Sequence, residues 1–127
     1  MFNSTVRPDP PESVSIVSKT SRGVTVSWSP GFDGNSDILN YTVRISEDNQ
    51  NFRDAKCQGL SSGACVLPTS STSASLEDLR PGRIYFFKVF ASNKVGQSAE
   101  SSVVNTTTDE EGIVHLLTVM MRINAFP

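Results

Sequence analysis

Residues 79–98 read LRPGRIYFFKVFASNKVGQS, and this stretch decides the fold class of the chain. After the Pro-Gly pair, an apolar residue occupies every second position, at Tyr85, Phe87, Val89 and Ala91. Successive side chains of a strand point to opposite faces, so such alternation is typical of a β-strand with one buried face. The stretch therefore predicts a strand over residues 85–91.

Six further segments have the alternation or composition of short strands. They are residues 13–19, 23–29 and 38–46, a short segment around Phe52, and residues 73–79 and 98–107. Turn formers separate them, as in PGFDGNSD at 30–37, while the pattern weakens over residues 47–73 into a long polar loop. Seven short strands without a helical period predict an all-β fold, a seven-stranded antiparallel immunoglobulin-like β-sandwich.

The inward-facing residues of these strands form the expected core. Leu79, followed by a Pro-Gly turn and by Tyr85, predicts a tyrosine corner, in which the ring packs in the core and the hydroxyl reaches the preceding backbone. The expected core residues are Val24, Val26, Trp28, Tyr41, Val43, Leu76, Leu79, Tyr85, Phe87 and Val89.

Four motifs occur in the order found in one family. PDPPESVSI, VTVSW, DGNSDILNYTV and LRPGRIYFFKVFASNKVGQS together resemble a fibronectin type III domain over residues 8–108. The loop and strand DGNSDILNYTV most resembles domains of immunoglobulin-superfamily cell-surface receptors such as sidekick, Dscam, contactin and the LAR-type receptor phosphatases. The residues that match the family's motifs are Trp28, Tyr41, Leu79, Tyr85, Asn93 and Gly96.

This resemblance implies a domain at residues 11–108, preceded by a linker at 1–10 and followed by a tail of uncertain structure at 109–127. It implies a non-enzymatic protein-interaction and spacer module from the ectodomain of a cell-surface adhesion or signalling receptor. The partner would be another protein or a neighbouring domain of the same chain. The alternative is an intracellular spacer of a muscle or cytoskeletal protein.

Composition excludes several other functions. The formal net charge is −2 and Lys and Arg are scattered, so no basic face for nucleic acid is expected. No apolar run reaches the roughly 18 residues of a membrane span, and the first residues lack the apolar core of a signal peptide. We therefore expect a fragment of a larger membrane-anchored protein that lies outside the cell, with a cytosolic chain as the other possibility.

No residues have the spacing of a catalytic, cofactor-binding or metal-binding set. The single histidine, His115, lies in the tail, and paired carboxylates or a Gly-rich phosphate loop are lacking. The two cysteines are too few ligands for zinc. We expect no enzymatic activity and no cofactor.

Cys57 and Cys65 are separated by the flexible span QGLSSGA. In an oxidising compartment they are expected to form a disulfide that contributes about 2.5 kcal/mol through loop entropy. In a cytosolic domain they would instead be two free thiols.

Three sequons for N-glycosylation begin at Asn3, Asn40 and Asn105. Chance alone gives about two in a chain of this composition, so they are weak evidence for secretion. All three are expected to be exposed and available for modification in the secretory pathway.

Phe86 and Phe90 are the sharpest functional signal. Alternation directs both rings away from the core, beside Thr42 and Arg44 of the neighbouring strand. With Lys88 and Arg44 as flanking cations, the two rings predict the apolar centre of a protein-binding face. The alternative is that the long insert or a partner domain covers them.

The tail segment IVHLLTVMM at 113–121 is apolar but too short to span a bilayer. It is expected to be sequence foreign to the family. A truncated segment or a segment packed on a sheet edge are the alternatives.

Overall fold

The computed structural model describes residues 4–59 and 64–111, and the described part consists of strands joined by loops. The all-β prediction is confirmed, with one strand more than the seven predicted. The strands in chain order are β1 Glu12–Lys19, β2 Val24–Ser29, β3 Asn40–Ser46, β4 Arg53–Asp54, β5 Cys65–Pro68, β6 Ser73–Leu76, β7 Ile84–Ser92 and β8 Val104–Thr107.

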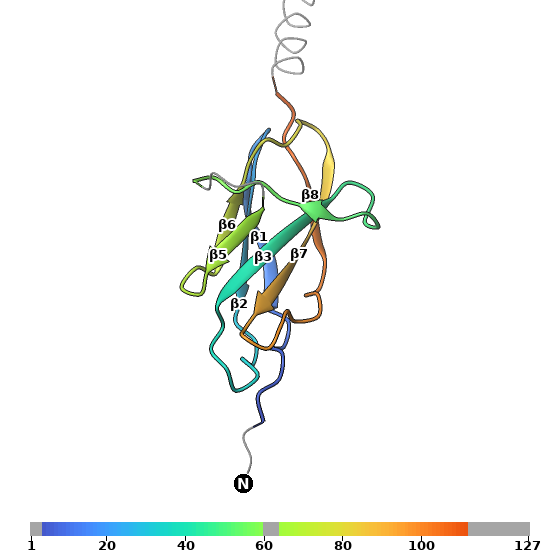
Figure 1. Cartoon of the computed structure of the whole chain (residues 1–127). Helices are drawn as coiled ribbons and strands as arrows, with labels where there is room; N and C mark the ends of the chain where they lie inside the picture. The colour runs from blue at the N-terminus through green and yellow to red at the C-terminus, as the bar shows by residue number, and fades with distance from the viewer. Residues whose placement is uncertain (1–3, 60–63, 112–127) are drawn as a thin grey trace, which may run out of the picture.

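Two antiparallel sheets face each other across the core (Figure 1). The three-stranded sheet has the order β1-β2-β6, and the five-stranded sheet contains β4-β3-β7-β8. Strands β4 and β5 both pair with the same edge of β3, one after the other along it. Strand β5 pairs with residues 40–43, and β4 pairs with Arg44 and Ile45. The sequence placed β5 in a polar loop because four residues are too few to show alternation.

The last strand is shorter than predicted, because two serine side chains replace part of its ladder. The Oγ atom of Ser98 accepts the backbone N–H of Ala91 at 2.9 Å, and that of Ser101 accepts the N–H of Val89 at 2.9 Å. Both serines are buried. The regular ladder with β7 is therefore confined to β8, instead of extending over residues 98–107.

All ten predicted core residues are buried. The Trp28 ring, 4% exposed, lies with its centroid 5.4 Å from that of Tyr41, and burial raises the pKa of the Tyr41 hydroxyl. The core also contains residues that the sequence did not assign to it, among them Ala55, Cys57 and Cys65. These three come from the segment that the sequence interpreted as a polar loop.

The tyrosine corner is present as predicted. The backbone N–H of Arg80 donates to the Tyr85 hydroxyl oxygen at 2.8 Å, and both Leu79 and Tyr85 are buried. This bond fixes the turn between β6 and β7, where the chain crosses from one sheet to the other.

A disulfide joins Cys57 and Cys65 at one edge of the sandwich, with their Cα atoms 5.2 Å apart. The backbone of Cys57 pairs with that of Leu76 in β6, a strand of the three-stranded sheet. Cys65 is the first residue of β5 and pairs with Val43 of β3 in the other sheet. The disulfide therefore ties the two sheets together at an edge where no ladder connects them.

The segment before β1 is held at one pole of the domain. Backbone N–H groups of Val6 and Asp9 donate to Gly34 and Phe32 in the β2–β3 loop, at 2.9 and 2.8 Å. The buried Asn93 side chain donates to the carbonyls of Val6 at 2.7 Å and of Asp33 at 2.9 Å. The direction in which residues 4–10 approach the domain is thus set by specific bonds.

The segment after β8 is held at the opposite pole (Figure 1). The Thr108 hydroxyl donates to the Arg80 carbonyl at 2.5 Å, and the Glu111 carboxylate accepts from Ser21 and Arg22, both at 2.6 Å. The bond from Ser21, followed by those from Arg22, lowers the pKa of Glu111. The chain therefore enters and leaves the domain at opposite ends in defined directions.

Candidate functional site

The predicted binding residues lie on the outward side of the five-stranded sheet. The term "outer face" is used below for six side chains there: Arg44, Phe52, Val66, Phe86, Lys88 and Phe90. Strands β3 and β7 run side by side through this sheet (Figure 1). Their register places Phe90 opposite Thr42 and Lys88 opposite Arg44. Alternation predicted that these side chains share the outward side, but it did not predict this register.

Lys88 lies at the centre of the outer face, against aromatic rings. Its Nζ atom is 4.0 Å from the centroid of Phe52 and 5.7 Å from that of Phe90. The same atom bonds Glu100 at 2.7 Å, and the Lys88 side chain is only 15% exposed. Cation–π contacts of a partly desolvated ammonium contribute about 1–2 kcal/mol, so this group holds both rings in fixed positions.

Arg44, beside Lys88, has a guanidinium without a close partner among the described residues. Its Nη2 atom is 3.7 Å from the Asp54 carboxylate, beyond hydrogen-bond length. Its Nε atom is buried and has no hydrogen-bond partner within the described part of the chain. Because the side chain is still 40% exposed, the guanidinium can donate to a group that approaches from solvent.

Phe52 reaches the outer face because a tight turn leads the chain back from β3. The Asp48 carboxylate accepts the backbone N–H groups of Asn51 at 2.8 Å and Gln50 at 2.9 Å, and the Ser46 hydroxyl at 2.8 Å. These bonds, that from Asn51 foremost, hold the pKa of Asp48 well below its usual range. Asp48 therefore stays ionised and keeps the turn ordered.

Phe86 and Phe90 are half-buried, which corrects the expectation of two exposed rings. Phe52, from the insert after β3, lies against Lys88 and reduces the open surface. Val66, on the strand that the sequence missed, is 41% exposed and lies opposite Thr42, in one row with Phe90. The insert thus covers Lys88 with Phe52 and adds apolar surface of its own.

Two members of the outer face, Phe52 and Val66, and the ion-pair partner of Lys88, Glu100, were not found from the sequence. Phe52 was recognised only as part of a possible strand. Val66 and Glu100 carry no local signal, because their positions depend on pairing with residues distant in the chain.

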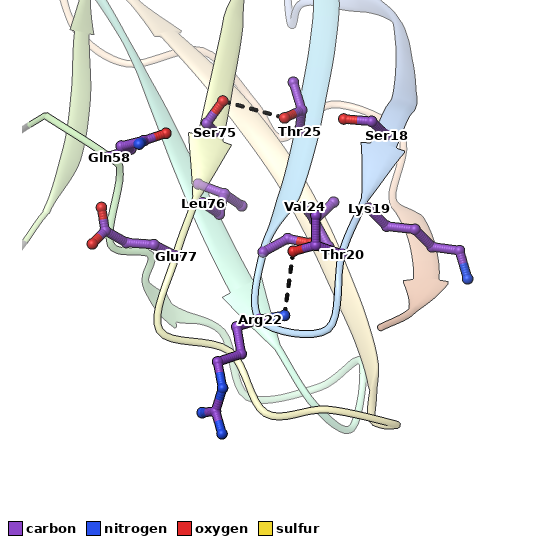
Figure 2. Close-up of a pocket in the computed structure, with 11 residues that line it drawn as sticks. Ser18, Lys19, Thr20, Arg22, Val24, Thr25, Gln58, Ser75, Leu76 and Glu77 are labelled. Carbon is purple, nitrogen blue, oxygen red and sulfur yellow. Dashed lines mark hydrogen bonds between the residues drawn. The ribbon is translucent and has the colours of Figure 1, made fainter. Parts of the chain in front are cut away.

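A hollow on the other sheet has a volume of about 300 Å³ and offers no comparable chemistry. Figure 2 shows Arg22 and Lys19 pointing away from the other lining side chains. Arg22 is paired with Glu111 and Lys19 with Asp109. Within residues 4–59 and 64–111, no group of three His, Cys, Asp or Glu side chains is placed to hold a metal ion.

Two of the sequons lie on the outward side of the five-stranded sheet. Asn40 is half-buried between Pro68 and Ser92, and Asn105 is exposed on β8, directly opposite Phe86. Asn3 and the apolar tail segment lie outside the described residues. In the part of the chain that is described, no helix is long and apolar enough to cross a membrane.

Residues 9–107 match the fibronectin type III domain family, which agrees with the two sheets, the tyrosine corner and the buried Trp28. The chain belongs to the fibronectin type III family. The family match covers most of the chain and leaves the last residues outside. Whether residues 1–10 act as a linker and 109–127 as a separate tail stays a prediction.

This fibronectin type III domain is similar to parts of much longer proteins. It is 32% identical over 103 residues to the cell adhesion molecule DSCAM of Rattus norvegicus, which covers 81% of the chain and 5% of DSCAM. It is 40% identical over 85 residues to sidekick-1 of Gallus gallus, which covers 67% of the chain and 4% of that protein. The chain thus spans about one-twentieth of the DSCAM relative.

Among solved structures, domains A168–A170 of titin superpose with a TM-score of 0.69 and 26% identity. The match covers 82% of the chain and 33% of the titin fragment. The domain is thus similar both to a segment of the cell adhesion molecule DSCAM and to domains of titin.

Proposed function

We propose that this fibronectin type III domain is a non-enzymatic interaction and spacer module in the ectodomain of a cell-surface adhesion or signalling receptor. The observation that carries the proposal is the anchoring of the segments before β1 and after β8 at opposite poles, by Asn93 at one and by Thr108 and Glu111 at the other. A rigid sandwich with such ends transmits length and orientation between its neighbours. The similarity to the cell adhesion molecule DSCAM supports a receptor context.

The outer face is proposed as the surface that contacts another protein. Two of its rings, Phe52 and Phe90, already lie against Lys88, so less conformational entropy is lost in ordering them when a partner binds. Glu100 already neutralises Lys88, whereas the nearest carboxylate to the partly exposed Arg44 guanidinium among the described residues is that of Asp54 at 3.7 Å. The fitting partner therefore presents an apolar patch next to a carboxylate that Arg44 can bind.

A photo-cross-linking amino acid at position 66 of the receptor, displayed on cells, tests this face. We expect one discrete cross-linked protein, because Val66 is exposed beside Phe90. Arg44→Ala should abolish that product without loss of folding, since the only ion pair of Arg44 within the described residues is a long contact to Asp54. The measurement is the mass of the cross-linked species after denaturing electrophoresis.

Val17 provides the matched control for this experiment. It is also an exposed valine, at 61%, but it lies on β1 in the opposite sheet. The same cross-linker at position 17 should give no discrete product. Equal labelling from both positions would show that the outer face has no specific partner.

The similarity to titin favours a second candidate, an intracellular spacer. The two candidates differ in the chemistry of Cys57 and Cys65. A secreted domain keeps them oxidised, whereas a domain made in the cytosol, where glutathione and thioredoxin keep thiols reduced, carries two free thiols.

Mass spectrometry of the protein from its native source, alkylated in denaturant immediately on lysis so that buried thiols also react, separates the two candidates. For a receptor ectodomain we expect no alkylation at Cys57 or Cys65 and added sugar mass on peptides containing Asn40 or Asn105. Two alkylated thiols and unmodified asparagines would reject the receptor proposal in favour of the intracellular spacer.

A further inference from the structure

The end of the outward surface near β8 has a composition that the protein-binding proposal does not explain. Phe86 is half-buried and has two cross-strand neighbours, Ser46 on β3 and Asn105 on β8. Two residue pairs further along the ladder, on the same side of the sheet, Ile84 is 44% exposed and lies opposite Thr107. An aromatic ring and an exposed isoleucine thus lie beside a pair of polar residues on an edge strand.

The two polar residues are the first and third positions of one sequon, Asn105-Thr106-Thr107. Both are exposed, whereas Thr106 between them pairs with the buried Tyr85. Side chains directly opposite each other in an antiparallel pair have Cβ atoms about 4.5–5.5 Å apart. A sugar attached to Asn105 therefore starts within reach of the Phe86 ring.

The chemistry of the first sugar matches this surface. One face of a β-linked N-acetylglucosamine presents C–H groups, and the electron-rich face of an aromatic ring attracts such groups. The Asn105 side chain stands roughly perpendicular to the sheet. The sugar can then lie over Phe86 and cover part of Ile84.

We propose that Asn105 carries an N-linked oligosaccharide whose first N-acetylglucosamine packs on Phe86. Phe86 is then a platform for the glycan, and the protein-contacting part of the outer face is reduced to the end with Val66, Phe90 and Arg44. The inference rests on the secretory location proposed above. It does not depend on a protein partner.

The modification itself uses the ordinary donor of the secretory pathway, a lipid-diphosphate-linked oligosaccharide. The amide nitrogen of Asn105 forms a bond to the anomeric carbon of the first sugar. The bond from that carbon to the diphosphate oxygen breaks, the amide loses one proton, and the lipid diphosphate leaves. No oxidant or reductant is needed.

The test uses the whole chain, secreted from eukaryotic cells with an added secretion signal. In a background with Asn3→Gln and Asn40→Gln, the glycan on Asn105 is trimmed enzymatically to one N-acetylglucosamine. The melting temperature of this protein with a single sugar on Asn105 is compared with that of the Asn105→Gln protein in the same background. We expect the single sugar to raise the melting temperature by about 4 °C.

The decisive comparison repeats this measurement with Phe86→Ser and with Phe86→Leu. The Phe86→Leu protein is expected to fold because it keeps an apolar side chain at this position, but it has no aromatic face for the sugar. We expect the sugar to give no rise in either variant. In the parent, NMR should show nuclear Overhauser contacts between the Phe86 ring and the sugar ring protons.

A glycan on Asn40, in an Asn3→Gln and Asn105→Gln background, is the matched control, since Asn40 lies opposite Pro68 and Ser92. Phe86→Leu should not change its effect. The proposal is overturned if Asn105 remains unglycosylated, if the stabilisation persists in Phe86→Leu, or if no ring contact is seen. The cross-link from position 66 is a separate readout, so failure of the glycan platform leaves the protein-binding proposal standing.

Discussion

Trp28→Ala is expected to lower the free energy of unfolding by about 3–5 kcal/mol, which unfolds a domain of ordinary stability. Trp28 is 4% exposed and packs against Tyr41 in the space between the two sheets. Truncation removes buried apolar area and leaves a cavity that two hydrogen-bonded sheets cannot close by moving together. Equilibrium urea unfolding, followed by circular dichroism, measures the loss.

Trp28→Phe is the control for this prediction. The phenyl ring fills much of the indole volume, and the Trp28 Nε1 atom has no hydrogen-bond partner in the described residues that would be lost. Its effect should be much smaller than that of alanine. If Trp28→Ala unfolds at the same urea concentration as the parent, the ring is not part of the core.

Replacing both cysteines, with Cys57→Ala and Cys65→Ala, is expected to cost about 2.5 kcal/mol. The cross-link restricts the unfolded chain, and in the folded state it joins β5 to the segment beside β6. The Gln58 N–H donates to the Ser75 carbonyl at 2.8 Å, and the Glu77 N–H donates to the Lys56 carbonyl at 2.9 Å. Hydrogen exchange at these two amides should accelerate more than at amides of β7.

Reduction of the parent protein separates the stability contributed by the cross-link from the stability lost when two buried side chains are replaced. A thiol reductant should lower the parent's melting temperature by about 10 °C or more and leave that of the double-alanine protein unchanged. An unchanged melting temperature of the reduced parent would contradict the role of the disulfide as a tie between the sheets.

Alternation in the sequence predicted the strands that bury one whole face. In β2, β3 and β7, apolar residues recur at every second position over six residues or more, so the inward face can be assigned without a structure. Leu79 and Tyr85 predicted the corner because that turn is local, and the bond to Arg80 spans five residues.

The candidate site was predicted only in part. Alternation gave the direction of Phe86, Lys88 and Phe90, but it could not give their exposure, because Phe52 and Glu100 approach from other parts of the chain. Likewise, nothing in the sequence pairs Asn105 with Phe86. That juxtaposition follows from the register of β8 against β7.

By itself the sequence determined that two layers of strands enclose a core with Trp28 and Tyr41, because a period of two encodes which side of each strand excludes water. Only the tertiary structure decided that residues 65–68 pair with β3, that Ser98 and Ser101 shorten the last ladder, and which side chains share the outward surface. These features depend on hydrogen bonds and contacts between residues far apart in the chain, and the local sequence does not show which distant residues will be partners.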